Sequence, residues 1–423
     1  MNKKCSIWVL TATCICSIVA SATSCSSYDE QCIESFEKVK THRITSEQAV
    51  QNALNFVSQY GLKTRASSTP FTVSEVKAIG VKEVGTRSAN DSICLDSLFY
   101  VINFDNNMGF VIAASDDRET PIFAYIEEGR YEENDTLNNG YEAFIDALID
   151  KEVYHNTEHQ SFREDDGDGV IIGGGGGGSS SYRPDKFEVQ LPLLTTRWGQ
   201  INYSTYCPGD YTGCVVTAVA QICSFLKSPN HVSWAYNGIG NQCYIDWDRI
   251  VGECGSCNGN PISNDLKDQI ANLMRFWGVA FDAEYGSDGT GVDSDDAISK
   301  MRELGYNATG LTDYDATNVM NDLKAGDRIV FMRGNARYYH VGFVFRKYVD
   351  GHAWVVDGYI HSIKNNKESL YMHCNWGWDG YRNGYFLSDV LNAEEMPYYD
   401  DNANAVTRSS NYRYRLKTST ICK

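Results

Sequence analysis

The chain has 423 residues, of which 42% are hydrophobic and 12% aromatic, and its formal net charge at pH 7 is −18. This length allows about one to three domains with a substantial core. The acidic balance argues against a nucleic-acid partner, because binding phosphates requires clustered lysine and arginine.

The N-terminus has the pattern of an export signal. Lys3 and Lys4 precede an apolar stretch, residues 7–20, that is too short to span a membrane as a helix. Small residues follow, so we expect a signal peptide over residues 1–24. Two outcomes stay open: ordinary cleavage, or lipidation of Cys25 as in a bacterial lipoprotein, although Ala22 stands where a leucine is usual. In both cases we expect export from a bacterial cell, with membrane attachment only through Cys25.

Residues from about 41 to 163 are predicted to form one α+β unit. Thr45 and Ser46 precede apolar residues spaced three and four apart, which indicates the start of a helix. The runs 98–104 and 109–114 read as strands, and the Asn-Asn pair between them predicts a hairpin. No catalytic pattern occurs in this unit.

Residues 164–186 form the clearest linker of the chain. An acidic run, 164–169, is followed by six consecutive glycines, 173–178, and three serines. Holding six glycines in a packed element costs much conformational entropy, and such a segment is an open target for proteolysis. A phosphate-binding loop would need a following Gly-Lys-Ser/Thr and a helix, which are missing here. We expect a cut before Phe187.

Residues 187–423 have the pattern of an enzyme domain. Apolar periodicity predicts helices first and strands afterwards, at 214–226, 266–277 and 295–304, then at 329–332, 340–345, 353–356, 370–374 and 384–387. This order predicts an α+β domain with a helical half and an antiparallel sheet half. A cleft between the halves would bring Cys214 to the strand of His352.

Cys214 is the candidate nucleophile among fourteen cysteines. It follows Gly213 at the first turn of an apolar helix, and a helix N-terminus favours a thiolate. An imidazolium beside it would lower the pKa of the thiol further, to below about 4. The alternative is a small core residue, which fits Cys223 within the helix stripe much better.

His352 is the favoured base among eight histidines, and His340 is its main competitor. Asn375 is the candidate side chain that orients the imidazole, and Trp376 would shield that contact from water. The backbone N–H of Cys214 is one candidate oxyanion donor. The pattern alone leaves the side chain of Gln200 open as the second.

Cys243, Cys254 and Cys257 lie in a loop rich in glycine and asparagine. A zinc site would need a second pair of this kind, so a loop clip or free thiols is favoured. Neither a metal nor an organic cofactor is implied.

Together these residues resemble the streptopain family, papain-like cysteine peptidases that are made as zymogens. The resemblance covers nearly the whole chain after the leader. It rests on the runs 212–222, with Val216 where an alanine is usual, 351–358 and 373–380. It implies that Gln200 is the oxyanion glutamine, that Gly351 binds the substrate backbone, and that Thr290 lines the substrate site.

The resemblance also implies that residues 25–163 are an inhibitory propeptide, which folds alone and covers the active-site cleft. The runs 100–104 and 109–118 carry it. Two departures stand out. The family's Pro-Tyr-Asn is replaced at 202–204, and extra residues before Gly351 predict a longer hairpin in the sheet half.

We therefore expect an exported cysteine endopeptidase with residues 187–423 as its catalytic domain. Its partners would be protein or peptide substrates, with an apolar side chain second before the scissile bond implied by the resemblance, and its own propeptide. The alternatives are a catalytically silent homologue and a transferase or amidase that uses the same cleft.

Overall fold

The structure is a computed structural model that describes residues 7–10, 42–64, 70–85, 92–132, 139–161, 183–256, 259–286, 289–341, 345–392 and 414–422. Cys25, Cys257 and residues 164–182 of the expected linker lie outside the described residues. Of the expected leader, only Ile7–Leu10 is described, as the edge strand β1. The backbone of His340 is described but its side chain is not.

The N-terminal unit is an antiparallel sheet with two long helices. Its elements are α1 (Ser46–Thr64), β2 (Val73–Gly85), β3 (Ser92–Phe104), β4 (Phe110–Ala114), β5 (Ile122–Ile126) and α2 (Asn139–Ser161). The strands follow one another in the sheet in chain order, from β1 to β5.

Local sequence explains two features of this unit. Thr45 N–H donates to Gln48 Oε1 (2.8 Å) and Gln48 N–H donates to Thr45 Oγ1 (3.3 Å), a reciprocal cap that starts α1. Asn106 and Asn107 have φ of 56° and 60°, the left-handed conformations that a tight hairpin turn requires. The predicted helix start and the predicted hairpin are both confirmed.

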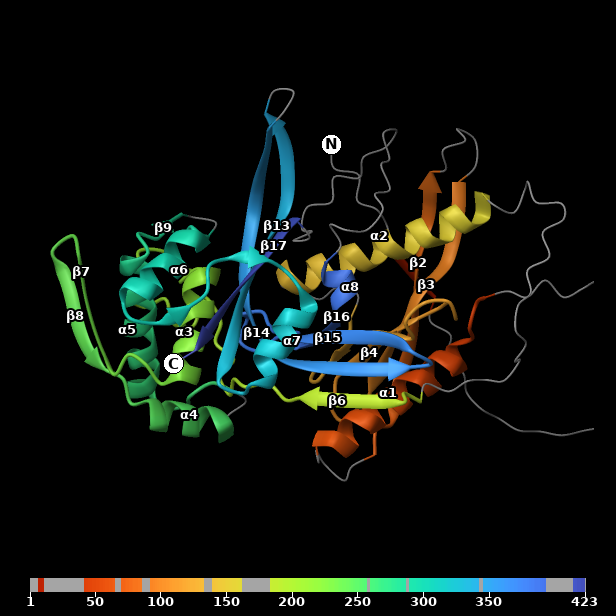
Figure 1. The fold of residues 1–423 in the computed structure, drawn as a ribbon, viewed down its shortest axis with the longest axis horizontal. Coiled ribbons are helices and arrows are strands. Elements are labelled where there is room, and N and C mark those ends of the chain that lie inside the picture. Colours follow the sequence, from red (N-terminus) through yellow and green to blue (C-terminus); the bar gives the residue numbers. More distant parts are fainter. Residues whose placement is uncertain are drawn as a thin grey trace, which may run out of the picture.

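The C-terminal unit has a helical half and a sheet half, as predicted. In chain order its elements are β6 (Lys186–Gln190), α3 (Cys214–Leu226), β7 (His231–Tyr236), β8 (Ile239–Tyr244), α4 (Trp247–Ser256), α5 (Asn264–Ala280), β9 (Glu284–Tyr285), β10 (Thr290–Gly291), α6 (Ser294–Glu303), β11 (Asn307–Ala308), β12 (Thr312–Asp313), α7 (Ala316–Lys324), β13 (Arg328–Val341), β14 (Phe345–Lys364), β15 (Lys367–Asn375), β16 (Gly384–Leu387), α8 (Ser388–Leu391) and β17 (Tyr414–Cys422). In Figure 1, α3 to α6 lie at one end, the N-terminal unit lies at the other, and β13 to β17 run between them.

One prediction about the strands is wrong in detail. Residues 329–332 and 340–345 were expected as two strands, but β13 runs without a break from Arg328 to Val341. It pairs with β14 from Val330↔Val356 to Val341↔Phe345. The expectation of a longer hairpin before Gly351 is confirmed, since this pair extends well beyond Gly351.

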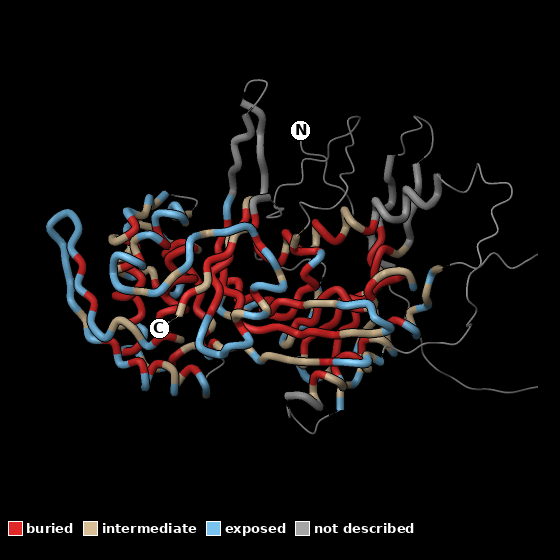
Figure 2. The backbone as a smooth tube through the Cα atoms, in the orientation of Figure 1, coloured by how far each residue is buried: buried red, intermediate tan, exposed pale blue. Residues whose placement is uncertain are grey.

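The two units share one sheet. Strand β5 pairs with β16 in antiparallel register, with Ile126 opposite Gly384 and Ala124 opposite Phe386. Thirteen of the described strands therefore form one sheet that crosses from the N-terminal unit into the sheet half of the C-terminal unit. One hydrophobic core spans both of these parts, and a second core fills the helical half around α3 and α5. Figure 2 shows the buried backbone running through both units.

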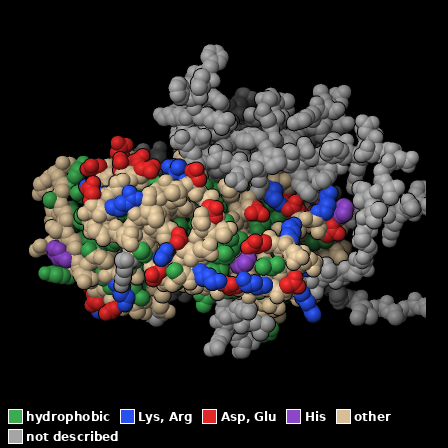
Figure 3. Space-filling model, in the orientation of Figure 1, with side chains coloured by type: hydrophobic (Ala, Val, Ile, Leu, Met, Phe, Trp, Pro, Cys, Tyr) green, Lys and Arg blue, Asp and Glu red, His purple; other side chains and the backbone are tan. Residues whose placement is uncertain are grey.

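In the coloured part of the surface drawn in Figure 3, acidic and basic side chains lie interspersed with one another. In the part of the chain that the structure describes, no helix is both long enough and apolar enough to cross a membrane.

Candidate active site

Cys214 is the first residue of α3, at the boundary between the helical half and the sheet half. Gly213 precedes it with φ 97°, a backbone conformation that residues other than glycine rarely adopt. Cys214 is partly exposed and packs against the hydrophobic cluster that contains Ala353, the residue after His352. The fold therefore brings Cys214 to the strand of the candidate base.

The electrostatics of this pair are those of two neutral groups. Burial raises the pKa of the Cys214 thiol, although backbone N–H groups of Ala353 and Val215 oppose the shift. Burial lowers the pKa of His352 to about 4. At pH 7 the thiol is thus protonated and the imidazole uncharged. The sequence led us to expect a lowered thiol pKa; the difference arises because burial outweighs the backbone N–H groups and because the uncharged His352 supplies no positive charge.

His352 is held by a different partner. Its Nε2 lies 3.1 Å from the carbonyl oxygen of Trp376, so this nitrogen carries the proton and donates it. Its ring stacks on Trp354 with centroids 5.9 Å apart. His352 pairs with Gly334 across the β13–β14 hairpin, whereas His340 lies six residues further along β13, about 20 Å at the rise of a strand. This placement favours His352 over His340 as the partner of Cys214.

Asn375 does not bond to the imidazole, contrary to the role expected for it. Its Oδ1 accepts from Gln221 Nε2 (3.2 Å) and Gly377 N–H (3.3 Å). Its Nδ2 donates to Gln221 Oε1 (3.1 Å) and the Thr196 carbonyl (3.0 Å). The side-chain amide of Asn375 is therefore bonded to Gln221 of α3 instead of to His352. The backbone carbonyl of Trp376 accepts the hydrogen bond from His352.

Trp376 is fully buried and connects the base to the N-terminal unit. Its indole lies against Trp354 and Phe386, with centroids 5.1 and 5.2 Å away. A Cβ built on Gly140, in the first turn of α2, would lie 2.0 Å from Cε3 of this indole. The backbone of α2 thus lies directly against the indole of Trp376, and the backbone carbonyl of the same residue accepts the hydrogen bond from His352.

The other predicted site residues lie around the approach to Cys214. Gln200 accepts the N–H of Thr212 through its backbone carbonyl (2.8 Å), and within the described residues its side-chain amide has no partner. Thr290 donates its hydroxyl to the carbonyl of Tyr211 (2.7 Å) and contacts Gly213. Gly351 is exposed beside His352.

The remaining thiols behave as structural residues. Cys223 is buried inside α3, and burial raises its pKa to about 12. Among the described cysteines, Cys243, Cys254 and Cys374 are also free of disulfides. Cys243 and Cys254 are therefore not joined to each other, and Cys257, the third cysteine of this loop, lies outside the described residues.

One group of described residues has the donor types of a metal site. His42, Asp116 and Asp117 place their ligand atoms within 4.8 Å of one another. Arg118 already binds both oxygens of Asp116, at 2.6 and 2.8 Å, and His42 bonds to Asp117. The group lies in the N-terminal unit, away from Cys214, and its charges are already paired.

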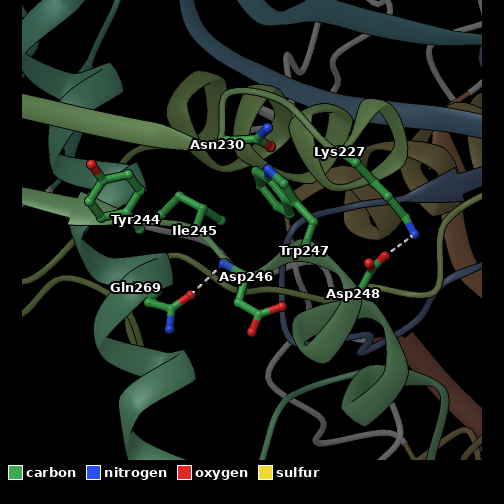
Figure 4. Close-up of a pocket in the computed structure, with 8 residues that line it drawn as sticks. All are labelled: Lys227, Asn230, Tyr244, Ile245, Asp246, Trp247, Asp248 and Gln269. Carbon is green, nitrogen blue, oxygen red and sulfur yellow. Dashed lines mark hydrogen bonds and ion pairs between the residues drawn. The ribbon is translucent and has the colours of Figure 1, made fainter.

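A surface hollow lies at the other end of α3. Figure 4 shows it between Lys227, Tyr244 and Gln269, with Trp247 at its centre. Because α3 has 13 residues, about 20 Å at the helical rise, this hollow is remote from Cys214. It contains none of the predicted site residues.

Sequence reasoning missed Gln221 and Asp379. Gln221 is fully buried on α3, and Asp379 accepts the N–H of Gly199 (3.1 Å). A signal for Gln221 was available, because an uncharged amide inside an otherwise apolar helix needs hydrogen-bond partners. Asp379 follows the Trp-Gly-Trp run and had no signal of its own.

Comparisons with known proteins match both units. The model of the peptidase C10 family matches residues 198–386, and the model described as Spi protease inhibitor matches residues 41–151. Streptopain from Streptococcus pyogenes serotype M28 is 24% identical over 374 residues, covering 81% of this chain and 88% of that protein. Thiol protease/hemagglutinin PrtT from Porphyromonas gingivalis is 24% identical over 367 residues, covering 82% of this chain and 39% of that protein.

Among solved structures, prointerpain A from Prevotella intermedia is 21% identical and covers 83% of this chain and 98% of that one, with a TM-score of 0.48. The two family models fall on the two units that the fold joins through β5 and β16. The chain belongs to the peptidase C10 family of streptopain-type cysteine peptidases, and it carries its inhibitory propeptide N-terminal to the peptidase.

Proposed function

We propose that Cys214 is the nucleophile and His352 the base of an exported endopeptidase that stays silent until the linker is cut. The observation that carries this proposal is the packing of α3 against β14, with Cys214 against the same hydrophobic cluster as Ala353, the residue after His352. The domains proposed are a leader at 1–24, a propeptide at 25–163, a linker at 164–186 and a peptidase at 187–423.

In the active form, His352 takes the proton of Cys214, and the thiolate attacks the scissile carbonyl carbon. The carbonyl electron pair moves to oxygen, where the Cys214 N–H and the Gln200 side chain stabilise the oxyanion. The C–N bond then breaks as the imidazolium protonates the leaving amine. Water hydrolyses the thioester with His352 as base, and the thiolate leaves.

The described form lacks the charges that this chemistry needs. The lowered pKa of His352 and the raised pKa of Cys214 keep both groups neutral at pH 7. Activation on this proposal requires His352 to leave the Trp376 carbonyl and to pair with Cys214. Gly351 and Thr290 would contact the substrate on either side of the thiol, since they flank His352 and Gly213.

Export is part of the proposal and rests on the signal pattern of residues 1–24. Cys25 is the residue that would carry a lipid. The substrates proposed are proteins or peptides. The only membrane contact proposed is through that lipid.

The test is a fluorogenic peptide panel applied to linker-cut protein, with and without a thiol-directed inhibitor. We expect Cys214→Ala and His352→Ala to lower kcat by at least about a thousandfold, as losses of nucleophile and base do. His340→Ala is the matched control and should keep its activity. Loss of activity in His340→Ala with activity kept in His352→Ala would reverse the assignment of the base. Acyl transfer to amines without hydrolysis would instead support a transferase.

A further inference from the structure

Gln221 joins the two segments that carry the partners of Cys214. It lies fully buried on α3, seven residues after the thiol. Its Oε1 accepts the N–H of Trp198 (2.9 Å), two residues before Gln200. Its amide also pairs with that of Asn375, the residue before the Trp376 carbonyl that holds His352.

The orientation of both amides follows from their backbone partners. Trp198 N–H can only donate, so it fixes Oε1 of Gln221 on its side. Gly377 N–H likewise fixes Oδ1 of Asn375. With these orientations set, each amide donates once to the other, at 3.1 and 3.2 Å. These hydrogen bonds fix the positions of Trp198, Asn375 and Gln221 relative to one another.

The segment that carries Gln200 is held at three successive residues. Gln221 binds the N–H of Trp198, Asp379 binds the N–H of Gly199 (3.1 Å), and the carbonyl of Gln200 accepts from Thr212 (2.8 Å). A Cβ on Gly199 would lie 2.3 Å from the Asp379 carboxylate. The backbone is thus fixed while the Gln200 side chain stays unbonded among the described residues.

From this network we infer that Gln221 is a positioning residue for catalysis, which sets the place of the Gln200 oxyanion donor and of the Asn375–Trp376 segment relative to Cys214. The inference rests on the proposed function of Cys214 and Gln200. Gln221 touches no reacting atom, and it acts through the two segments it binds. Because Asp379 and Thr212 also hold the segment with Gln200, loss of Gln221 should displace that segment without freeing it.

The test compares linker-cut parent, Gln221→Leu, Gln221→Glu and Gln269→Leu. Gln269 is the matched control, because its Oε1 also accepts a backbone N–H, that of Asp246 (2.8 Å), at the far end of α3 (Figure 4). For Gln221→Leu we expect kcat to fall about a hundredfold with KM within about threefold, the loss typical of a misplaced oxyanion donor. Gln269→Leu should keep the parental kcat.

Two further readouts separate positioning from general loss of structure. Alkylation of Cys214 by iodoacetamide needs no oxyanion donor, so its rate should change much less than kcat in Gln221→Leu. Gln221→Glu should regain activity as the pH falls, because a protonated carboxyl both donates and accepts as the amide does, and burial raises the pKa of such a carboxyl. If the activity of Gln221→Glu depended on pH in the same way as that of the parent, the inference would be wrong. This readout remains decisive if Gln221→Leu fails to fold.

The outcomes distinguish the two levels of the proposal. If the parent cleaves peptides and Gln221→Leu turns over equally fast, the positioning role is wrong and the proposed function stands. If the linker-cut parent cleaves nothing, the proposed function and this inference fall together. A drop in kcat matched by an equal drop in alkylation rate would assign Gln221 to the stability of α3 instead.

Discussion

Gly140 places the backbone of the propeptide helix α2 against the indole of Trp376. A methyl group at this position would lie 2.0 Å from a ring carbon. Neither group can move freely, since Trp376 is fully buried and its Nε1 donates to the carbonyl of Arg382 (3.1 Å). The absence of a side chain at 140 thus allows the propeptide to approach the segment that holds His352.

We predict that Gly140→Ala weakens docking of the propeptide, because overpacking a filled site costs about 1–3 kcal/mol. At 1.4 kcal/mol per tenfold change, the docked propeptide should dissociate roughly 10- to 100-fold more readily. The measurement is the peptidase activity that appears immediately after the linker is cut.

Gly61→Ala on α1 is the matched control, because a Cβ there meets nothing within 4 Å. It should leave that activity unchanged. Equal activity in Gly140→Ala and the parent would show that α2 does not need its close contact with Trp376.

At the scale of elements, strands β5 and β16 join the propeptide to the peptidase, and a charged group closes their end. His373 on β15 bonds to Asp357 Oδ1 (2.6 Å) and lies 3.3 Å from Oε2 of Glu127, the residue after β5. Tyr60 on α1 donates to the same carboxylate, and the Tyr385 ring packs on His373 with centroids 5.0 Å apart. One carboxylate of this group thus belongs to the propeptide and the other to the peptidase.

The pKa values of this group define a pH window for docking. Burial alone would lower the pKa of His373, but Asp357 and Glu127 raise it to about 9. The contribution of the imidazolium to docking is therefore complete below its usual pKa of 6.5 and is lost as the pH rises through 9. Burial would raise the pKa of Glu127, but the bonds from His373 and Tyr60 hold it below its usual 4.5. Its contribution is present above pH 4.5 and is lost as the pH falls through the lowered pKa.

We predict that the cut propeptide stays bound near neutral pH and dissociates more readily as the pH falls below 4.5. Glu127→Gln should bind more weakly at pH 7, by about 10- to 100-fold, because a bond to a charged group contributes about 1.5–3 kcal/mol. Dissociation of the propeptide from Glu127→Gln should also no longer increase as the pH falls below 4.5. Dissociation can be followed by size-exclusion chromatography across pH.

Glu128→Gln makes the same change at the next residue, whose half-exposed carboxylate pairs with Arg197. Such exposed pairs contribute little, so we expect near-parental binding. An acid-dependent dissociation that persists in Glu127→Gln would assign the pH dependence to other groups.

Elements with local signals could be predicted from the sequence, and pairings between distant segments could not. The cap at Thr45, the Asn-Asn turn and the apolar helix after Cys214 each depend on a few neighbouring residues. The pairing of β5 with β16 joins residues more than 250 positions apart, and it follows from tertiary packing rather than from propensity. The bond of Asn375 to Gln221 was missed for the same reason, since the sequence offered His352 as the nearer chemical partner.

At the scale of the whole molecule, a shared sheet and a shared hydrophobic core join the propeptide to the sheet half of the peptidase. A second core packs the helical half, including Cys214, against residues of β13, β14 and β17. The propeptide therefore contacts the half that carries His352 and Trp376. Through Gly140 it reaches Trp376, whose backbone carbonyl accepts a hydrogen bond from His352.

We predict that maturation depends on the peptidase itself. Cys214→Ala expressed alone should accumulate as the full-length chain, because the only nucleophile proposed for cutting the linker is gone. The N-terminus and mass of the exported protein give the result. Trimming of Cys214→Ala at the rate of the parent would show that another protease cuts the linker.

The most direct measurement is peptide cleavage by one preparation before and after its linker is cut, for the parent and for Cys214→Ala. We predict that before the cut the parent cleaves peptides far more slowly than after it and that Cys214→Ala cleaves none, because the pKa values of His352 and Cys214 keep both groups neutral in the docked form. After the cut and release of the propeptide, the parent should cleave peptides and Cys214→Ala should not. Equal activity of the parent before and after the cut, or activity in Cys214→Ala, would contradict a Cys214 peptidase silenced by its propeptide.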